Sequence, residues 1–509
     1  METRESFTVT DVRLPDSTGL VDIFVDKGRI SRLVRAATSR DGRTEYAGNG
    51  HLVLPRFIDV HSHADARVWF PTLSVDKSVQ GIGHEIVGNC GLGPAPSAGS
   101  GRGWRAILSG VGIAGPPGWE FADIDEYLAQ LQGNNRGIPP RLSTLLPYGA
   151  VRATVGDLRR QLDSAEVTEV ASLIERGLAS TVGVSMGLVY PPNDGATWPE
   201  LMETLRPLSD GGVLAVHMRS QANLWIEAVD EVLQLAGALR LRLLISHLCV
   251  GGHRNQWKVD WVLARLRAAR DQGIDVYFDQ HPYSAGSTSF TQLIPGEYLR
   301  SGHDGVEIAL PLEQLMEILA SPSNIPGWEN YLELVGPDHI LIAGSEVAPD
   351  LAGKTVGQVA TELSIHPVAA IEAITRRTGG RATMVLTDLY DEDRIDQIVR
   401  EPNGVISTDS VHVALPHPRL YGTYPYAFSR FVRGKVITES EFVHRTSSLP
   451  AEIFGLDSGG GIALGSTADF LVVDPLTFGH EPDYLDPARP VTGIVLQVIE
   501  GRPQMAAAS

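Results

Sequence analysis

The sequence predicts an α/β fold, a (β/α)8 TIM barrel with a small β-sandwich domain formed by both chain termini. Eight short apolar runs of the length of a buried strand recur between residues 57 and 408, with helical segments between them. Short β-branched runs with no helical period lie at both ends of the chain. A chain of 509 residues, 43% of them hydrophobic, is long enough for one large barrel with attachments.

The first and last segments are expected to meet in the β sandwich, with residues 1–54 as its N-terminal part and 451–509 as its C-terminal part. The N-terminal strands are expected at 7–12, 21–25 and 30–34, separated by Asp16, Gly19 and the Lys27-Gly28 turn. The C-terminal strands are expected at 469–474 and 491–499.

Residues 55–450 are expected to form the barrel. Its candidate strands lie at 57–60, 85–87, 142–146, 181–185, 214–217, 243–247, 275–279 and 404–408. The clearest helix is 257–272, where Val259, Val262, Leu263 and Leu266 form one apolar stripe. More than one helix and two loops separate the last two strands, so we expect an insertion at about 285–345 that contains a helix over 310–319.

Charge and composition narrow the class of partner. The chain has 42 Lys and Arg against 61 Asp and Glu, a formal net charge of −19, which argues against a nucleic-acid partner. No apolar run is long enough to span a membrane, and the polar start lacks the pattern of a signal peptide. Two cysteines, Cys90 and Cys249, fit a reducing compartment. We therefore expect a cytoplasmic protein with a small-molecule substrate and no membrane contact; a homo-oligomer is compatible with the sequence but nothing fixes its symmetry.

The sharpest motif is His61-Ser62-His63, directly after the first barrel strand. Residues i and i+2 of a strand face the same way, so both imidazoles are expected to point into the barrel mouth. Two neutral imidazoles on one side suit a divalent metal. Alone, the motif is equally compatible with a hydrogen-bonded histidine pair.

Other residues of metal-ligand type follow further strands. Cys90 follows the second strand, His217 and His247 end the fifth and sixth, and Asp409 follows the eighth. Each alone has a structural reading: a small buried hydrophobe, hydrogen-bonded core histidines and a helix N-cap. Together they mark five strand ends on the rim where barrel enzymes carry their reactive groups, and this coincidence favours a metal site.

The pattern resembles the amidohydrolase superfamily and, within it, the D-aminoacylase (N-acyl-D-amino-acid deacylase) family. The resemblance extends over nearly the whole chain. The stretches that carry it are Leu54-Pro-Arg-Phe-Ile-Asp-Val-His-Ser-His63, Val87-Gly-Asn-Cys-Gly91, Gly187-Leu-Val-Tyr-Pro-Pro192, Val216-His-Met-Arg-Ser220, Ile245-Ser-His247, His281-Pro-Tyr-Ser-Ala-Gly-Ser-Thr288, His417-Pro-Arg-Leu-Tyr-Gly422 and Thr446-Ser-Ser-Leu-Pro-Ala451.

The resemblance implies the site and the cofactor. It implies one tightly bound Zn²⁺ on Cys90, His217 and His247, and a second, weaker metal position formed by His61, His63 and Asp409. Zinc lowers the pKa of its bound water and so supplies hydroxide for attack on an amide carbonyl. Asp409 is the expected general base, which takes the proton from the water and delivers it to the departing nitrogen.

Substrate contacts are also implied by the resemblance, at Tyr190, Tyr283, Ser287 and Arg419. The planar guanidinium of Arg419 suits a carboxylate, although an arginine among prolines and tyrosines is equally compatible with a structural clamp. Arg219, two residues beyond His217, is a further candidate, because on a continuing strand it would face the same way.

Two departures from the family concern recognition. Cys249 stands where D-aminoacylases usually carry a lysine, and Thr408-Asp409-Ser410 replaces the usual Ser-Asp-Gly. We therefore expect a zinc-dependent amidohydrolase acting on the linear amide of an N-acyl amino acid, in the first instance an N-acyl-D-amino acid, or a related acylated amine. Two alternatives stay open: a cyclic-amide hydrolase of the dihydropyrimidinase type and a catalytically silent scaffold.

Overall fold

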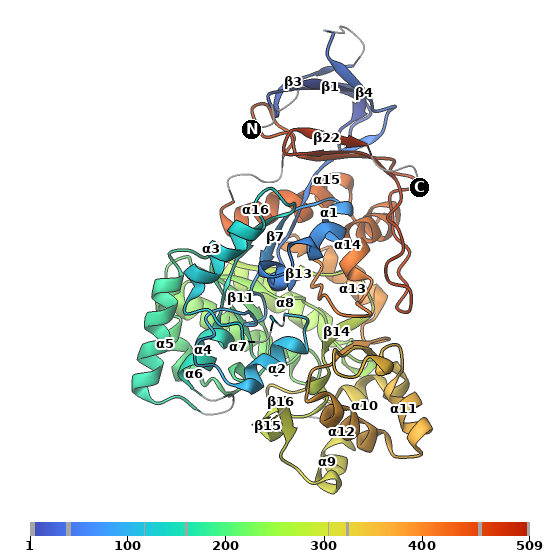
Figure 1. Cartoon of the computed structure of the whole chain (residues 1–509). Helices are drawn as coiled ribbons and strands as arrows, with labels where there is room; N and C mark the ends of the chain where they lie inside the picture. The colour runs from blue at the N-terminus through green and yellow to red at the C-terminus, as the bar shows by residue number, and fades with distance from the viewer. Residues whose placement is uncertain are drawn as a thin grey trace.

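The computed structural model describes residues 6–36, 42–113, 115, 116, 118–156, 158, 161–303, 305–321, 325–456 and 461–505. Strands from both ends of the chain lie at one end of the molecule, and a group of helices and strands from residues 286–386 lies at the other (Figure 1). The parallel strands and their helices lie between them.

Both termini contribute to one hydrogen-bonded sheet of eight strands. Its order is β22-β21-β20-β5-β1-β2-β3, with β4 also paired to β1. Strand β20 runs antiparallel to β5, with Leu471 opposite Leu54, so the last part of the chain completes a sheet that the first part begins. The strands are β1 (Phe7–Arg13), β2 (Leu20–Asp26), β3 (Arg29–Arg35), β4 (Thr44–Ala47), β5 (Leu52–Pro55), β20 (Phe470–Val473), β21 (Ile494–Ile499) and β22 (Arg502–Met505).

The parallel strands follow one another in chain order. One sheet has the order β6-β7-β8, and a second has the order β9-β10-β11-β12-β13-β19. Only Leu145 separates β8 from β9, and its N–H donates to the carbonyl of Val87 at 2.9 Å. The strands are β6 (Phe57–Asp59), β7 (Ile82–Val87), β8 (Arg141–Thr144), β9 (Leu146–Pro147), β10 (Val184–Gly187), β11 (Val213–His217), β12 (Arg242–Ile245), β13 (Val276–Gln280) and β19 (Gly404–Ile406).

The segments that follow the first and last parallel strands lie side by side. The N–H of Asp409 donates to the carbonyl of His61 at 2.8 Å, and the N–H of His63 donates to the carbonyl of Ser410 at 3.1 Å. These two bonds form a parallel bridge between Ser62 and Ser410. The two ends of the strand series are thereby joined at the carboxyl side of the strands.

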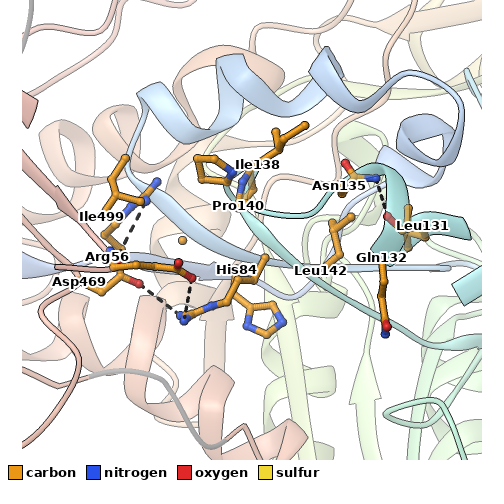
Figure 2. A pocket seen from close by; sticks show the side chains of 15 residues that line it. Arg56, His84, Leu131, Gln132, Asn135, Ile138, Pro140, Leu142, Asp469 and Ile499 are labelled. Carbon is orange, nitrogen blue, oxygen red and sulfur yellow. Dashed lines mark hydrogen bonds and ion pairs between the residues drawn. The ribbon is translucent and has the colours of Figure 1, made fainter. Parts of the chain in front are cut away.

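A cavity of about 390 Å³ lies at the opposite, amino side of β7 and β8, next to the terminal sheet. Figure 2 shows Arg56, His84 and Asp469 on its wall. Arg141 pairs with Asp469 at 3.2 Å, while Arg56 is buried and donates to the hydroxyl of Ser78 at 2.8 Å. Charged side chains therefore connect the terminal sheet to the parallel strands.

Helices cover the outside of the parallel strands. The predicted helix over 257–272 is α8 (Lys258–Asp271), and its apolar stripe is buried. The other helices of this layer and of the preceding loops are α1 (Val75–Val79), α2 (Arg102–Ser109), α3 (Ile124–Asn134), α4 (Tyr148–Val155), α5 (Ser164–Gly177), α6 (Trp198–Thr204), α7 (Trp225–Leu239) and α13 (Glu392–Val399). Helix α5 begins with a capping box in which Asp163 and Glu166 bond each other's backbone N–H.

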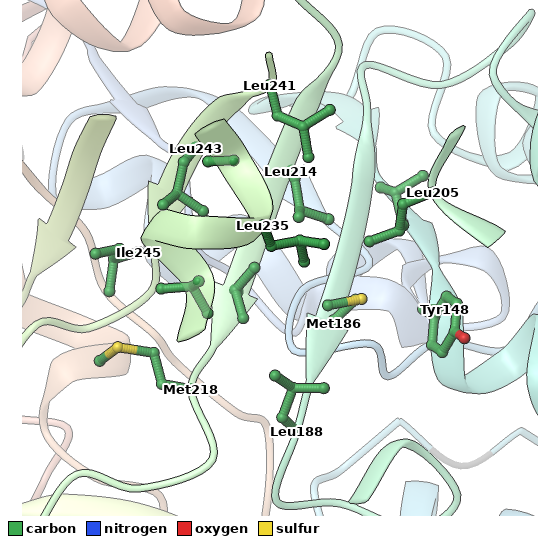
Figure 3. Close-up of a cluster of buried hydrophobic side chains, with 14 of the residues drawn as sticks. Tyr148, Met186, Leu188, Leu205, Leu214, Met218, Leu235, Leu241, Leu243 and Ile245 are labelled. Carbon is green, nitrogen blue, oxygen red and sulfur yellow. The ribbon is translucent and has the colours of Figure 1, made fainter. Parts of the chain in front are cut away.

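The largest core lies between these helices and one face of the strands. Figure 3 shows Met186, Leu214 and Leu243 from β10, β11 and β12 packed beside Leu235 of α7. The alternate residues Ala215 and Leu244 point to the other side of the strands and belong to a separate cluster. Both faces are buried, which explains why the strands read as nearly continuous apolar runs.

The inserted segment between β13 and β19 has its own antiparallel sheet, in the order β14-β18-β17. It also contains a two-stranded hairpin and the predicted helix over 310–319, which is α9 (Leu312–Leu319). The sheet continues past the expected boundary near residue 345, because β17 pairs with β18. The elements are β14 (Gly286–Ser289), β15 (Leu299–Gly302), β16 (Gly305–Ile308), α10 (Tyr331–Val335), β17 (Ile340–Gly344), α11 (Val356–Leu363), α12 (Pro367–Thr378) and β18 (Thr383–Leu386).

A run of helical segments leads from β19 back to the terminal sheet: α14 (Arg419–Ala427), a π-helical turn at Phe428–Arg433, α15 (Glu439–Val443), a second π-helical turn at His444–Ser448 and α16 (Leu449–Phe454). The Arg445 guanidinium donates to the carbonyls of Glu401 and Gly404, which ties this run to the start of β19. Among the described residues, no helix combines the length and apolar character that crossing a bilayer requires.

Candidate functional site

All six residues predicted as metal ligands lie at the carboxyl ends of the parallel strands and are buried. His61 and His63 follow β6, and Cys90 follows β7. His217 is the last residue of β11, His247 follows β12, and Asp409 follows β19. The structure therefore brings together side chains that are separated by up to several hundred residues in the sequence.

Cys90 lies among three imidazoles. Its Sγ is 3.2 Å from Nε2 of His61, 3.7 Å from Nδ1 of His217 and 3.7 Å from Nε2 of His247. Donor atoms of His61, Cys90 and His247 all lie within 4.8 Å of one another. One thiolate with neighbouring imidazoles is a donor set typical of zinc.

A second group of donor atoms shares His61 with the first. Asp409 Oδ1 is 3.4 Å from Nε2 of His61 and 3.4 Å from Nε2 of His63. The donor atoms of these three residues also lie within 4.8 Å of one another. Two imidazoles and one carboxylate likewise suit a divalent metal, so the residues present fit the predicted cofactor.

Three of these residues have left-handed backbone conformations. Cys90 has φ 55°, His247 has φ 36° and Asp409 has φ 47°. Such angles are uncommon for residues other than glycine and cluster at functional sites. The backbone at Cys90 also packs closely against β10: a Cβ on Gly187 would lie only 2.2 Å from the carbonyl oxygen of Cys90. Glycine at 187 is thus required for the approach of this strand.

Asp279, at the end of β13, orients two of the histidines. Its Oδ2 is 3.1 Å from Nδ1 of His61, while its Oδ1 accepts from the N–H of His247 at 3.1 Å and from the hydroxyl of Ser407 at 2.6 Å. Burial opposes its charge, but His61 and these hydrogen bonds hold the pKa of Asp279 below its usual value. The carboxylate can therefore accept the Nδ1 proton of His61, and in the tautomer that this bond selects Nε2 would be offered to a metal.

The inserted segment supports His247 through Gln221. The side-chain amide nitrogen of Gln221 is 2.8 Å from Nδ1 of His247. Glu329, from the inserted segment, accepts the backbone N–H of Gln221 at 3.0 Å and that of Ala222 at 3.1 Å, and also bonds the hydroxyl of Ser220. The loop after β11 is therefore held by a buried carboxylate of another part of the chain.

Arg419 fixes the ionisation of Asp409. Its Nη1 is 2.8 Å from Asp409 Oδ2, and the arginine is only 1% exposed. Burial alone would raise the pKa of Asp409, but Arg419 and His61 hold it well below its usual value. Asp409 is therefore a carboxylate, able to accept a proton.

A buried charge network lies behind the first and last strand ends. The Lys77 ammonium bonds Asp59 Oδ2 at 2.7 Å and the Ser62 hydroxyl at 2.8 Å, and it pairs with Glu85. Asp59 in turn accepts the N–H of Thr408 at 2.9 Å and its hydroxyl at 2.6 Å. Lys77 thus links the residues that flank His61 and His63 to the residue that precedes Asp409.

The predicted substrate contacts divide into two groups. Tyr190, Ser287 and Arg419 line a cavity that is also lined by five of the six candidate ligand residues, all except His61. The Tyr190 hydroxyl lies 2.7 Å from that of Thr288. Tyr283 does not line this cavity: it is 1% exposed and stacks on Tyr426 with ring centroids 4.9 Å apart.

Arg219 also points away from this cavity. It pairs with Glu231 of α7 at 2.9 Å and donates to the carbonyl of Asp194 at 3.2 Å. The structure therefore does not bring Arg219 and Tyr283 to the ligand residues.

Asp279, Gln221 and Lys77 are three of the polar residues of this region that the sequence patterns did not identify. Asp279 had a usable signal, because it ends a predicted strand, as the ligands do. Gln221 and Lys77 had none, since each acts through residues remote in the sequence.

No protein-family model matches the chain. Curated proteins of Alcaligenes xylosoxydans xylosoxydans do match. Its D-aminoacylase is 29% identical over 460 residues, which cover 89% of this chain and 84% of the relative. Its N-acyl-D-aspartate deacylase is 27% identical, covering 94% and 87%, and its N-acyl-D-glutamate deacylase is 27% identical, covering 94% and 88%.

Solved structures agree with these relatives. One is the N-acyl-D-glutamate deacylase of Bordetella bronchiseptica, complexed with zinc and a phosphonate inhibitor that mimics the tetrahedral intermediate. It superposes with a TM-score of 0.80 at 25% identity, and the match covers 98% of this chain and 96% of that one. A D-aminoacylase with a binuclear metal centre gives 0.79 at 26%, with the same coverage.

More distant structures share the fold alone. The L-hydantoinase of Arthrobacter aurescens gives a TM-score of 0.54 at 14% identity, covering 99% of this chain and 98% of that one.

The curated relatives and the two deacylase structures together show that the chain is a homologue of the D-aminoacylases and N-acyl-D-amino-acid deacylases and resembles them over nearly its whole length.

Proposed function

We propose that the protein is a metal-dependent amidohydrolase that hydrolyses the amide bond of an N-acyl amino acid, with an N-acyl-D-amino acid as the preferred form. The observation that carries this proposal is the meeting of Cys90, three imidazoles and the Arg419-paired carboxylate of Asp409 at the carboxyl ends of the parallel strands, in a homologue of the deacylases. Thiolate and imidazole donors bind the metal, and the carboxylate moves protons.

The donor groups suggest the metal and its number. We assign zinc, because Cys90 offers a thiolate and His217 and His247 offer imidazoles around it. The tightly bound position would lie there, with a second, weaker one at His61, His63 and Asp409. When bound, the metal supplies polarisation of the amide carbonyl and a lowered pKa for a coordinated water.

Asp409 is assigned as the general base. Its carboxylate takes the proton of the attacking water and returns it to the nitrogen of the leaving amine, which must be protonated to depart. Arg419 keeps Asp409 ionised in the resting site and orients it through the 2.8 Å contact. Tyr190, Ser287 and Arg419, which line the cavity, are the assigned contacts of the substrate.

No observation favours the two alternatives. The likeness to hydantoinases is a likeness of fold, so it does not argue for ring opening. A silent scaffold has no need for a complete set of buried donor atoms together with an ionised carboxylate.

The test joins metal content to product analysis. Purified protein is assayed for bound metal and incubated with N-acetyl-D- and N-acetyl-L-amino acids, and both products are measured. We expect about one or two zinc ions per chain and release of a free amino acid together with acetate. Asp409→Asn should remove the activity, and Asp210→Asn, at a surface ion pair with Arg240, should keep it. Bound metal without release of a second molecule from any linear amide would refute the proposal.

The architecture that presents the site is part of the proposal. We infer that the two parallel sheets form one closed (β/α)8 barrel, on the strength of the Leu145 link and the Ser62–Ser410 bridge. We also infer a β sandwich from segments 1–54 and 451–509, a barrel over 55–450, and an insertion that runs from about 285 through the end of β18 at Leu386.

A further inference from the structure

The cavity of about 390 Å³ at the amino side of β7 and β8 is separate from the candidate metal ligands. Its lining residues include none of those six side chains, and they do not include Arg419. A cavity of this size can hold a small molecule. Barrel enzymes carry out their chemistry at the carboxyl ends of the strands, so a ligand bound here would take no part in hydrolysis.

The two ends of this cavity differ in chemistry. Figure 2 shows Arg56 and Asp469 at one end, which we call the polar end, and Leu131 and Leu142 at the other, which we call the apolar end. Further apolar side chains in the lining belong to Ile138, Pro139 and Pro140. A ligand that matches this layout has one polar group joined to one apolar part.

Two guanidinium groups at the polar end keep N–H groups without an acceptor. Arg56 donates from Nε and Nη2 to the turn between α1 and β7, at 2.8 Å to the Ser78 hydroxyl, while its Nη1 is 3.8 Å from Asp469 Oδ1. Arg141 donates from Nη2 to Asp469 Oδ2 at 3.2 Å, but its Nη1 is 3.6 Å from Glu500 and its buried Nε has no partner. Within the part of the chain that the structure describes, neither Nη1 has an acceptor at hydrogen-bond distance.

The carboxylates of the polar end leave a positive charge uncompensated. Asp469, whose side chain is 14% exposed, is shared by Arg56 and Arg141. The Glu500 side chain is 46% exposed, so water screens its charge. Two guanidinium groups therefore surround one largely buried carboxylate, and one further anionic group would balance them.

We propose that this cavity binds a small monocarboxylate with an apolar chain. The carboxylate accepts from Nη1 of Arg56 and Nη1 of Arg141 in charge-assisted hydrogen bonds, and the chain lies along the apolar end. Phosphate suits the cavity less, because it brings a second negative charge and has no apolar part. The inference is independent of the proposed function, since it concerns other residues at the other side of the strands.

Calorimetric titration of the full-length, metal-loaded protein with hexanoate tests the site. Hexanamide has the same chain without the charge, acetate has the charge without the chain, and inorganic phosphate is the alternative anion. We expect hexanoate to bind at least about tenfold more tightly than each of these three. Equal or tighter binding of any of them, or no binding of millimolar hexanoate, would overturn the proposal.

Variants locate the bound carboxylate, because Arg419 in the cavity at the ligand residues is a competing cation. Arg141→Met should weaken hexanoate binding by at least about tenfold. Binding should persist in Arg419→Met and in the control Arg206→Met, which affects a surface pair with Glu203. Loss of binding in Arg419→Met and its retention in Arg141→Met would place hexanoate at the ligand residues and refute the proposal.

Crystals of the unaltered protein soaked with a bromine-labelled hexanoate provide a test that does not depend on the folding of Arg141→Met. We expect the anomalous signal of a terminal bromine near Leu131 and Leu142, with the carboxylate between Arg56 and Arg141. A bromine signal only elsewhere, or none at all, would contradict the assigned site.

Discussion

The carboxylate of Asp279 and the imidazole of His61 face each other across the ends of β13 and β6, with Oδ2 3.1 Å from Nδ1. The same carboxylate accepts the backbone N–H of His247 at 3.1 Å. One buried side chain therefore fixes two histidines that both approach Cys90, with ring nitrogens at 3.2 and 3.7 Å from its sulfur.

Replacing Asp279 with Asn should weaken the metal site. An amide can turn its nitrogen toward Nδ1 and no longer selects the tautomer of His61 that leaves Nε2 free, so we expect a loss of about 10–100-fold in metal affinity or activity. Competition with a metal indicator dye measures the affinity. Asp275→Asn, which affects a surface pair with Arg242, serves as the control and should change neither value. Wild-type affinity in Asp279→Asn would exclude the orienting role.

Replacing Arg419 with Met should shift the pH dependence of hydrolysis. Arg419 and His61 hold the pKa of Asp409 well below its usual value against the effect of burial, so removal of the guanidinium raises that pKa. Because the base must be ionised, the acid limb of the kcat/KM profile should move to higher pH. Arg419→Lys keeps a cation and should move the limb less. If Arg419→Met lowered kcat/KM at every pH without moving the acid limb, Arg419 would not be what holds down the pKa of Asp409.

Removing the Lys77 ammonium should destabilise the fold. Burial opposes its charge, but Asp59 and Glu85 raise the pKa of Lys77, and the same cluster lowers that of Glu85 to about 2. Lys77→Met leaves both carboxylates buried without this partner, a loss of about 3–5 kcal/mol in unfolding free energy. Urea unfolding measures it.

The double variant Lys77→Met with Asp59→Asn provides the control for Lys77. It removes one of the uncompensated charges, so it should be more stable than Lys77→Met alone. If the loss of unfolding free energy in the double variant equalled the sum of the losses in Lys77→Met and Asp59→Asn, the charge explanation would be wrong.

His84 should contribute to acid sensitivity. Burial and then Arg141 lower its pKa from 6.5 to about 4, so below pH 6.5 the unfolded chain binds a proton that the folded chain does not. Its contribution to stability is therefore complete above pH 6.5 and is lost as the pH falls toward 4, by at most about 3 kcal/mol. His84→Gln, which can still bond Ser143, should flatten the stability profile between pH 6.5 and 4. Parallel profiles for the two proteins would disprove this.

Treatment with a chelator should abolish hydrolysis and lower the melting temperature, because a metal that binds only the folded state stabilises it by mass action. Added zinc should restore both. Cys90→Ser should need more zinc for the same recovery, since the hydroxyl is a poorer ligand than the thiolate. Full activity in metal-free protein would remove the basis of the proposed function.

The strand regions and the meeting of the six candidate ligand residues at the strand ends could be predicted because both depend on local sequence. That these six residues bind a metal stays a prediction. Buried strands read as apolar runs, and histidine or cysteine directly after such a run is conspicuous. Arg219 shows where local reasoning fails: its spacing from His217 aims it at the site only if the strand continues, but β11 ends at His217 and Arg219 turns to Glu231 of α7.

Contacts between distant segments were beyond local patterns. The sequence analysis gives Lys77 no role, and only the fold shows it buried against Asp59 and Glu85. The predicted end of the insertion near residue 345 stays a prediction, but β17, which ends at Gly344, pairs antiparallel with β18, a long-range contact that no local pattern indicates.

The pairing of Leu54 with Leu471 has a consequence for biosynthesis. Strand β5 leaves the ribosome early, yet the strand that covers its edge is translated only after the whole catalytic region. A growing chain must therefore carry an open, fully apolar sheet edge through most of its synthesis, a state prone to intermolecular pairing. Chaperone supply and translation rate should accordingly affect the yield of this protein.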